Sequence, residues 1–350
     1  MWKKLVLLVS TIIVFLFLFT AWRIFGSNTR FKEASKFLYI PSEHASFSSL
    51  LQTIKDSNYI ANPGLFAFVA RRMDLSEHLT AGRYEIKKGM SLYSLARMLR
   101  SGRQAPLNLV ITKLRTRENL AALIGRKFEC DSAEFMSFFD NNDSLQAYGF
   151  DTNTVMTAVF PDTYTLFWNA SPASVFRKFK SAHDRFWNEE RRAEAGKQGL
   201  SPAQAYILAS IVEEETNANE EKGNIASVYL NRYRKGMKLQ ADPTVKFALR
   251  DFGLKRIYEK YLLVESPYNT YRNKGLPPGP ICTPSLKSLD AVLNAPSTNY
   301  LYFVADSSFS GRHVFSATYS EHLKHAKEFQ EALTRQEKIR DARKADSSRR

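Results

Sequence analysis

An almost unbroken apolar run near the start of the chain is the feature that most constrains its fold. The run extends from Leu5 to Trp22, directly after Lys3 and Lys4, and contains no charged residue. A helix of this length is about 27 Å long, close to the thickness of the hydrocarbon core of a bilayer. We therefore expect residues 1–26 to form a short polar stub and a single transmembrane signal anchor.

A cleaved signal peptide is the alternative reading of this segment. Such a peptide has a shorter apolar core and ends at small residues, whereas this run ends in Trp22-Arg23-Ile24-Phe25. Trp2 and Trp22 also bracket it like the aromatic anchors of a membrane interface. The flanking basic residues do not decide the orientation, because they lie on both sides: Lys3 and Lys4 before the run, and Arg23, Arg30, Lys32 and Lys36 after it.

The composition of the whole chain indicates a globular protein that favours anionic partners. Of 350 residues, 44% are hydrophobic and 24% charged, which is too apolar for a disordered chain. The formal charge of +15 suits nucleic acid, a membrane surface or an anionic cell wall. Two cysteines, Cys130 and Cys282, exclude a disulfide framework, an iron–sulfur cluster and a CxxC-type zinc site, and leave open one bridge between them.

The pattern of elements predicts an α+β fold with a linker at 27–45 and a small α/β subdomain at 46–105. In the subdomain, Ser49 caps a helix to Lys55, Asn62-Pro63 starts another to Arg72, and a strand ends at Gly89. A helical stripe follows at Leu92, Leu95, Ala96 and Leu99. This strand–turn–helix resembles half of a LysM module, a small fold that binds polymers of N-acetylglucosamine. A generic packing unit of one strand and one helix remains the alternative.

We expect residues 106–334 to form a larger domain of mixed helices and strands, and residues 335–350 to form a basic tail. We expect a strand at 107–112, two or three helices to about 150, and a turn at Pro161-Asp162. Ser171-Pro172 opens a long helix to about Lys197, which Gly199 ends. The tail has the charge pattern of a solvated helix end rather than of a nucleic-acid arm.

A buried helix that ends in three acids carries the strongest chemical signal. Ser201, Pro202 and Gln204 form a complete helix start, and the apolar residues 205–212 lead into Glu213, Glu214 and Glu215. Carboxylates at this end oppose the helix dipole, which points to function, although acidic helix ends are often only solvated. Glu215 continues the stripe of Leu208, Ile211 and Val212, so its pKa should be raised as a general acid requires. Glu213 continues a more polar line.

Several further motifs stand in a recognisable order with this helix end. They are Val-Glu-Glu-Glu-Thr (212–216), Gln-Ala-Asp-Pro-Thr (240–244), Ser-Pro-Tyr-Asn-Thr-Tyr (266–271), Gly-Leu-Pro-Pro-Gly-Pro-Ile (275–281), Tyr-Leu-Tyr-Phe-Val-Ala (300–305) and Gly-Arg-His-Val-Phe (311–315). In sequence and spacing the chain resembles the endolytic murein transglycosylase family (MltG, or YceG-like) over residues 156–330. Many members carry Glu-Gly where this chain has Met156-Thr157, so any role of that acid is absent here.

The resemblance implies a lytic transglycosylase, a carbon–oxygen lyase that cleaves the MurNAc–GlcNAc bond of nascent peptidoglycan strands and leaves 1,6-anhydro-MurNAc ends. Its catalytic acid falls on Glu215. It further implies a single-pass protein of the bacterial inner membrane, with a cytoplasmic N-terminus and a periplasmic catalytic domain at 106–334. Termination of glycan elongation and association with peptidoglycan synthases belong to the same expectation. No cofactor and no metal are expected.

The matching motifs also supply candidate substrate contacts, and each has a structural alternative. A turn with an aspartate cap, loop-anchoring tyrosines and a structural histidine would explain most of them equally well. The candidates are Gln240, Asp242, Thr244, Tyr268, Asn269, Thr270, Tyr271, Leu276, Pro277, Pro278 and His313. His322 and His325 are expected to be ordinary helix-face residues, because no HExxH pattern surrounds them.

Three other functions compete with the transglycosylase. A membrane-anchored peptidoglycan-binding module without catalysis would need the same surface, and only product release separates the two. A nucleic-acid binder is suggested by charge alone, because the basic residues are dispersed and no nucleic-acid-binding motif occurs. A tethered protease lacks a serine, cysteine or metal signature. We therefore expect peptidoglycan strands and the bilayer as partners, and no nucleic acid.

Overall fold

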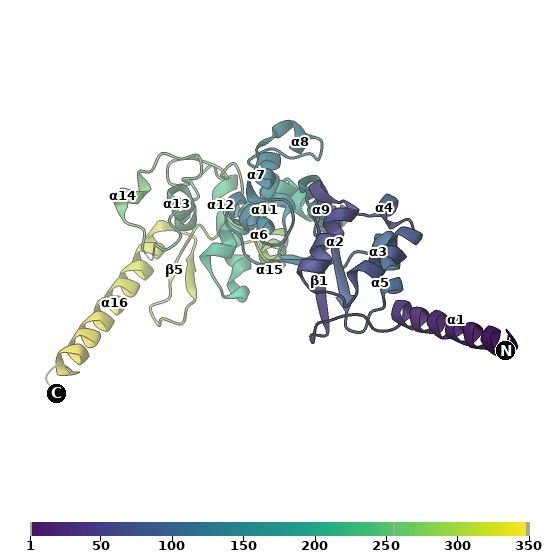
Figure 1. The fold of residues 1–350 in the computed structure, drawn as a ribbon. Coiled ribbons are helices and arrows are strands. Elements are labelled where there is room, and N and C mark those ends of the chain that lie inside the picture. The colour runs from purple at the N-terminus through teal and green to yellow at the C-terminus, as the bar shows by residue number, and fades with distance from the viewer. Residues whose placement is uncertain (1, 255, 348–350) are drawn as a thin grey trace. The chain divides into compact units, whose positions relative to one another are not determined.

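The computed structural model describes residues 2–254 and 256–347 as a mixture of helices and short two-stranded sheets (Figure 1). The predicted mixed fold is thus confirmed. The chain divides into two compact units. Unit 1 holds the chain up to Leu109 together with Ile124–Asp131 and Thr165–Pro172, and unit 2 holds Val110–Leu123, Ser132–Tyr164 and the chain from Ala173 onward. Each unit therefore includes more than one stretch of the chain.

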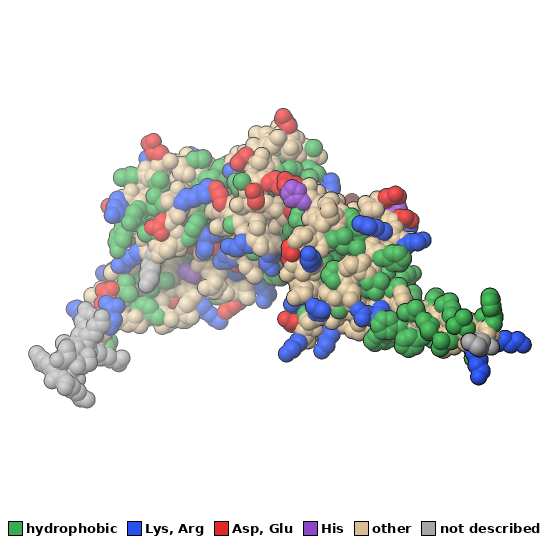
Figure 2. Space-filling view, viewed as in Figure 1, with side chains coloured by type: hydrophobic (Ala, Val, Ile, Leu, Met, Phe, Trp, Pro, Cys, Tyr) green, Lys and Arg blue, Asp and Glu red, His purple; other side chains and the backbone are tan. Residues whose placement is uncertain are grey.

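Helix α1 (Trp2–Phe25) is the predicted apolar helix. Its mean hydropathy is 2.6, none of its residues is buried, and among the described residues it alone is long and apolar enough to cross a membrane. Figure 2 shows apolar side chains covering it. At its end, the Asn28 amide donates to the carbonyl oxygens of Arg23 and Gly26, and Ile24 packs against the core of unit 1.

Unit 1 is built around an antiparallel pair of strands, β1 (Ser35–Ile40) and β2 (Gly82–Lys87), in which Leu38 lies opposite Tyr84. Their alternating inward side chains form a core with the apolar faces of the helices. The helices of this unit are α2 (Phe47–Asp56), α3 (Pro63–Arg72), α4 (Leu75–His78) and α5 (Leu92–Arg100). The predicted starts of α3 and α5 and the strand before Gly89 are confirmed.

Two local predictions for this region are wrong. Residues 27–45 are not a spacer, because β1 and the 3-10 turn η1 (Ser42–His44) lie within them and Leu38 is fully buried. Few residues of this strand are buried, so the polar composition of the segment does not indicate a strand. The α2 helix is capped by Ser46, whose hydroxyl accepts from the Ser49 N–H, rather than by Ser49 itself. The likeness to LysM stays a prediction.

A second sheet pairs β3 (Leu107–Ile111) with β4 (Asp162–Leu166). Within each of these strands the chain passes from one unit to the other. The predicted strand and the helices after it are confirmed. Between the strands lie α6 (Arg117–Gly125), α7 (Ser132–Asp140), α8 (Asn142–Gln146) and the 3-10 turn η2 (Val155–Ala158). The prediction of a single long helix over 172–197 is wrong. The segment forms two helices, α9 (Pro172–Phe186) and α10 (Glu189–Lys197), because Asn188 caps a new start by accepting from the Arg191 N–H.

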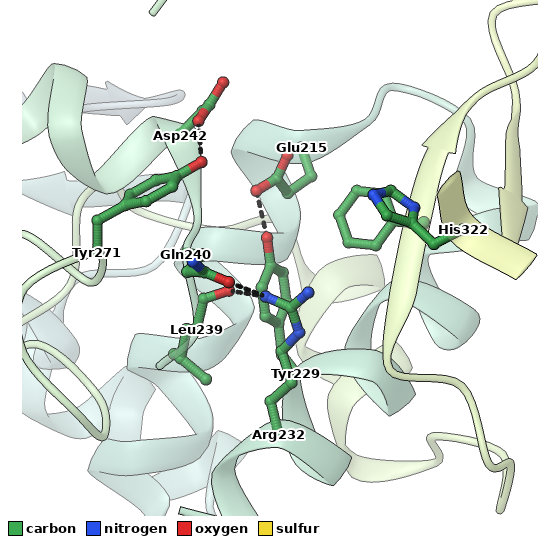
Figure 3. A pocket seen from close by; sticks show the side chains of 9 residues that line it. Glu215, Tyr229, Arg232, Leu239, Gln240, Asp242, Tyr271 and His322 are labelled. Carbon is green, nitrogen blue, oxygen red and sulfur yellow. Dashed lines mark hydrogen bonds between the residues drawn. The ribbon is translucent and has the colours of Figure 1, made fainter. Parts of the chain in front are cut away.

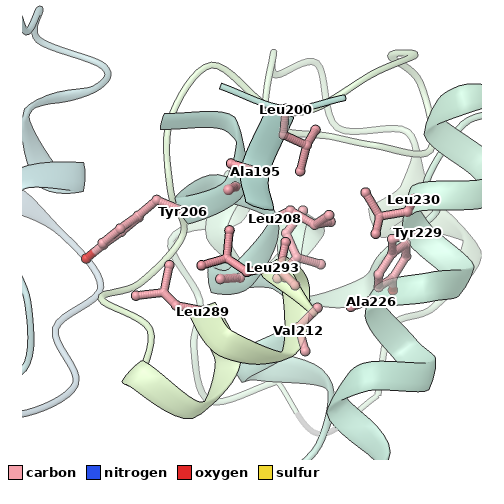
Figure 4. Close-up of a cluster of buried hydrophobic side chains, with 14 of the residues drawn as sticks. Ala195, Leu200, Tyr206, Leu208, Val212, Ala226, Tyr229, Leu230, Leu289 and Leu293 are labelled. Carbon is pink, nitrogen blue, oxygen red and sulfur yellow. The ribbon is translucent and has the colours of Figure 1, made fainter. Parts of the chain in front are cut away.

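The core of unit 2 surrounds α11 (Pro202–Glu215), in which the eight residues Ala205–Val212 are all buried. Helices α12 (Lys222–Arg234) and α15 (Leu286–Leu293) pack against it (Figure 4). This packing fixes the end of α11 in space. The other elements of this part are η3 (Asn219–Glu221), α13 (Asp242–Leu249), α14 (Glu259–Leu262), the antiparallel pair β5 (Tyr302–Ala305) and β6 (His313–Ser316), and α16 (Tyr319–Ser347).

Candidate active site

A cavity of about 310 Å³ opens at the C-terminal end of α11 (Figure 3). Side chains from α11, α12, the turn before α13, the loop after α14, β5 and α16 meet there, although they are far apart in the sequence. The lining residues are Glu215, Tyr229, Arg232, Leu239, Gln240, Asp242, Tyr271, Phe303 and His322.

The local sequence explains why Glu215 stands at this edge. Ser201 and Gln204 form the predicted capping box, with Pro202 at the first helical position, so α11 begins at a defined residue. Its apolar body holds the helix in the core. The backbone becomes extended at Thr216 (φ −146°, ψ 146°), so Glu215 is the last helical residue and its side chain reaches the cavity.

The three acids at the end of α11 have different surroundings. Glu213 accepts hydrogen bonds from Ser285 and Ser288 and forms an ion pair with the buried Lys222. Burial alone would raise the pKa of Glu213, but these hydroxyl and ammonium partners lower it. We infer that Glu213 is ionised at neutral pH and ties α11 to the start of α15.

Glu214 is held by two cations from the strand-end segment before α6. The Lys113 ammonium lies 2.9 Å and the Arg115 guanidinium 3.0 Å from its carboxylate oxygens. Burial would raise the pKa of Glu214, and the two cationic partners lower it overall. The charge that opposes the helix dipole is therefore compensated at both positions.

Glu215 has no such compensation from its bonded partner, which is a neutral phenol. The Tyr229 hydroxyl donates to Oε1 of Glu215 at 2.5 Å. Desolvation raises the pKa of Glu215 from 4.5 to about 7, against the lowering effect of the Tyr229 bond and with help from the nearby negative charge of Asp242. The predicted upward shift is confirmed. A carboxyl of this kind can both donate and accept a proton near neutral pH.

Arg232, three residues after Tyr229 on α12, supports the same part of the cavity wall. Its guanidinium donates to the carbonyl oxygens of Leu301 (2.6 Å) and Leu239 (2.7 Å) and to Oε1 of Gln240 (3.3 Å). Gln240 adopts a left-handed backbone conformation (φ 54°), which is rare for a residue with a side chain. Since its Oε1 is engaged by Arg232, the Gln240 amide presents its N–H₂ end as a donor.

Asp242 and Tyr271 form the other wall. The Tyr271 hydroxyl donates to Oδ1 of Asp242 at 2.5 Å. Burial raises the pKa of Tyr271, and the bond to Asp242 raises it further, so the phenol stays protonated. Asp242 is the first residue of α13, where a negative charge is favoured by the helix dipole. Asp242 lines the cavity, where its side chain can accept hydrogen bonds from a ligand.

Three of the predicted substrate contacts instead hold this wall in place. Thr270 accepts from the Ala241 N–H, and its hydroxyl bonds that of Thr244 at 2.8 Å. Asn269 donates to the carbonyl oxygens of Leu262 and Val264 and accepts from the Tyr271 N–H. Thr244, Asn269 and Thr270 are buried, so the structure places them behind the cavity rather than in it.

The remaining candidates lie elsewhere in unit 2. Tyr268 packs against Phe247 at 4.6 Å and lines a different cavity, and His313 bonds Glu221. The proline-stiffened segment of Leu276, Pro277 and Pro278 packs at the core, with Pro277 buried. Of the predicted site residues, the cavity thus brings together Glu215, Gln240, Asp242 and Tyr271.

Sequence reasoning missed Tyr229, Arg232, Phe303 and His322. Tyr229 and Arg232 lie three residues apart and are both buried, so a tyrosine and an arginine on one face of a helix, next to Ile225, Ala226 and Val228, were the available signal. His322 was wrongly taken for an ordinary helix-face residue. Its ring stacks on Tyr302 at 5.2 Å, and its buried Nδ1 has no hydrogen-bond partner among the described residues. Burial lowers the pKa of His322, which favours the neutral imidazole.

Metal-ligating and thiol chemistry have little support at this site. Within residues 2–254 and 256–347, no group of three or more His, Cys, Asp or Glu side chains is arranged to hold a metal ion. Cys130 and Cys282 are both buried thiols, and burial raises the pKa of Cys282 well above its ordinary value. The cavity is therefore one of carboxylates, phenols, an amide, a guanidinium and an imidazole.

Comparisons with known proteins agree on one family. The YceG-like family matches residues 38–328. An endolytic murein transglycosylase of Bacillus subtilis is 30% identical over 300 residues, which cover 81% of this chain and 82% of that protein. One of Streptococcus pneumoniae is 24% identical, and the match covers 75% of this chain but only 53% of that longer protein. A crystal structure of a yceG-like protein from Listeria monocytogenes superposes with a TM-score of 0.55 at 31% identity, covering 83% of this chain and 98% of that one.

Proposed function

The chain belongs to the YceG-like family, and on that premise we propose that it is an endolytic lytic transglycosylase that cleaves the glycan strands of peptidoglycan. The observation that carries the proposal is the carboxyl group of Glu215, which faces an open cavity with a pKa raised to about 7. A single carboxyl with this property is sufficient for a reaction that consumes no water and needs no second nucleophile.

Glu215 acts first as the general acid. Oε1 accepts a hydrogen bond from Tyr229, so the proton of the neutral carboxyl lies on Oε2 and is available to the glycosidic oxygen between MurNAc and GlcNAc. Proton transfer to that oxygen breaks its bond to the muramyl anomeric carbon, where positive charge develops. The substrate's own 2-acetamido group stabilises that charge.

Glu215 then acts as the general base. Its carboxylate, stabilised by the Tyr229 hydroxyl, removes the proton of the muramyl 6-hydroxyl, whose oxygen attacks the anomeric carbon. The products are a strand ending in 1,6-anhydro-MurNAc and a strand with a free GlcNAc 4-hydroxyl. Glu215 regains its proton, so the cycle closes without a cofactor.

The other lining residues bind and orient the sugars. The negative charge of Asp242, on the same cavity, favours positive charge on the reacting sugar. The N–H₂ of Gln240 suits the carbonyl oxygen of an acetamide, and the rings of Tyr271 and Phe303 suit sugar faces. The imidazole of His322 lines the same space, and its buried Nδ1 has no hydrogen-bond partner among the described residues.

We also propose that α1 anchors the protein in the inner membrane, with unit 2 in the periplasm, where it terminates nascent strands beside the synthases. The length and composition of α1 support the anchor. A phosphatase that is active only after export, fused to the C-terminus, tests the orientation; a fusion that is produced but inactive would contradict it.

Glu215→Gln tests the mechanism. The amide keeps the shape of the side chain but can neither donate nor accept the catalytic proton. We expect release of anhydro-muropeptides from purified strands, followed by mass spectrometry, to fall by about 10⁴-fold or more, since one group serves both steps. Near-normal release by a folded Glu215→Gln protein would refute the mechanism. Strand binding without release by the wild type would favour a binding module instead.

A further inference from the structure

Unit 2 has a second cavity, of about 170 Å³, at the opposite end of α13 from the candidate active site. Three guanidinium groups line it: Arg115, Arg117 at the start of α6, and Arg250 at the end of α13. Neutral hydrogen-bonding groups of Thr116, Thr152, Asn153 and Tyr268 complete the polar lining. Glu118 is the one carboxylate among the residues that line this cavity.

The arginines are held by acids that leave part of each guanidinium unused. Arg115 uses Nη2 for Glu214, Arg117 uses Nη1 for Asp140, and Arg250 uses Nη1 for Glu118. The pKa of Glu118 is about 2, because the bond from Arg250 and backbone donors outweigh the effect of burial, so it stays ionised. A guanidinium has five N–H groups, so the hydrogen bonds among the described residues leave donors on all three for a ligand.

Arg250 and Met156 both affect the charge of this lining. Arg250 has a left-handed backbone (φ 56°) at a helix end where glycine is favoured, so a long charged side chain is kept there at a conformational cost. Met156, 7% exposed, lines the same cavity. A carboxylate at position 156 would place a second negative charge among the arginines, and this chain has an uncharged thioether there.

The cavity is also suitably placed for a substrate that reaches the candidate active site. Helix α13 connects them, because its first residue, Asp242, lines one cavity and its end residue, Arg250, lines the other. Eight helical residues span about 12 Å. An extended peptide of four residues covers about 13 Å, so a short peptide that branches from a sugar in one cavity can reach the other.

We propose that the arginine cavity binds a carboxylate of the peptide stem of the glycan strand, while the sugars occupy the cavity at Glu215. Guanidinium groups bind carboxylates through paired, charge-assisted hydrogen bonds, which neutral donors of the same cavity can supplement. The inference rests on the proposed function for the identity of the ligand. It makes Arg117, Arg250 and the neutral residue at 156 determinants of substrate specificity.

Binding to a variant without turnover tests the proposal. Full-length Glu215→Gln protein in detergent is titrated with soluble uncrosslinked strands that carry peptide stems, and a second variant adds either Met156→Glu or its neutral isostere Met156→Gln. We expect Met156→Glu to bind about tenfold more weakly than Met156→Gln. Converting the free carboxyl groups of the strands to methyl amides should weaken binding to Met156→Gln by a similar factor and leave Met156→Glu little changed.

A pair of exposed arginines provides a test that does not depend on the fold of the Met156 variants. Arg250 and Arg312 are exposed to 59% and 61% and each pairs with one glutamate, but only Arg250 lines the cavity. Arg250→Gln should weaken binding several-fold more than Arg312→Gln.

The proposal would be overturned if the Met156→Glu and Met156→Gln variants bound the strands equally well, or if Arg250→Gln and Arg312→Gln did. It would also be overturned if converting the carboxyl groups of the strands to methyl amides had no effect on binding. A further contradicting result would be that strands stripped of their peptides bind equally tightly and that Met156→Glu weakens this binding. The ligand would then be the lactyl carboxylate of MurNAc. Product release by the wild type is measured on the same strands, so failure of catalysis is seen separately.

Discussion

Replacing Tyr229 with Phe should move the pH dependence of strand cleavage upward. The Tyr229 hydroxyl donates to Glu215 at 2.5 Å and stabilises the ionised carboxylate more than the neutral acid, which is why it lowers a pKa that burial raises. Cleavage requires the protonated acid, so activity is lost as the pH rises through about 7. Without the hydroxyl, the same loss should occur at higher pH.

The size of this shift follows from the strength of the bond. A hydrogen bond to a charged group contributes about 1.5–3 kcal/mol, and 1.36 kcal/mol corresponds to one pKa unit. The neutral carboxyl also accepts from Tyr229, so only part of this energy discriminates between the two forms. We expect the alkaline limb of the rate profile to rise by about one unit and the maximal rate to fall, since Glu215 also loses its orienting partner.

The assay is the initial rate of anhydro-muropeptide release between pH 5 and pH 10, with Tyr206→Phe as the matched control. Tyr206 is also fully buried and donates its hydroxyl to a backbone carbonyl, that of Val159, away from the cavity. Its loss should destabilise the fold by about 1–3 kcal/mol without moving the limb. An unchanged limb in a folded Tyr229→Phe protein would refute the assignment of Glu215 as the titrating acid.

Three further predictions concern stability. Glu215→Gln should melt at higher temperature than the wild type above pH 7 but not below pH 4.5, because the raised pKa of Glu215 removes folding stability as the pH rises from 4.5 to about 7, and thermal melts across this range measure the difference. Glu213→Gln should destabilise the fold by about 3 kcal/mol in urea unfolding, since it leaves the 4%-exposed Lys222 without its carboxylate. Glu214→Gln should destabilise the fold by less, because its cationic partners are about a third exposed. Equal losses of stability in the two variants would contradict this prediction. Deleting residues 2–22, which contain no buried side chain and spare Ile24, should give a folded protein that needs no detergent, as circular dichroism and sedimentation would show.

The position of Glu215 and its raised pKa could be predicted from the sequence because the relevant physics is local to one helix. The cap at Ser201, the apolar stripe and the position of Glu215 after Leu208, Ile211 and Val212 all lie within 15 residues, and the period of the helix relates them. The raised pKa of Glu215 follows from that stripe. The role of its partner Tyr229 did not follow, because a hydroxyl on the next helix is brought close only by the packing of α12 on α11.

The substrate contacts were harder to predict because a polar residue in a motif can either face a ligand or hold a turn. Asn269 and Thr270 lie beside Tyr271 in one motif, yet their side chains bond the backbone while Tyr271 reaches the cavity. Which of these occurs depends on where neighbouring segments leave donors and acceptors unpaired. Short motifs therefore locate the loop but not the contact.

The end of α11 has three acids in sequence, but only two of them are held as carboxylates by cations. Lys222 pairs with Glu213, and Lys113 and Arg115 with Glu214, so these two residues tie neighbouring segments to the helix. The negative charge of Glu214 helps to raise the pKa of Glu215 and so favours its protonated form. The site thus depends on the register of the helix end rather than on the number of acids: an acid one position earlier would meet two cations and lose the proton that the reaction requires.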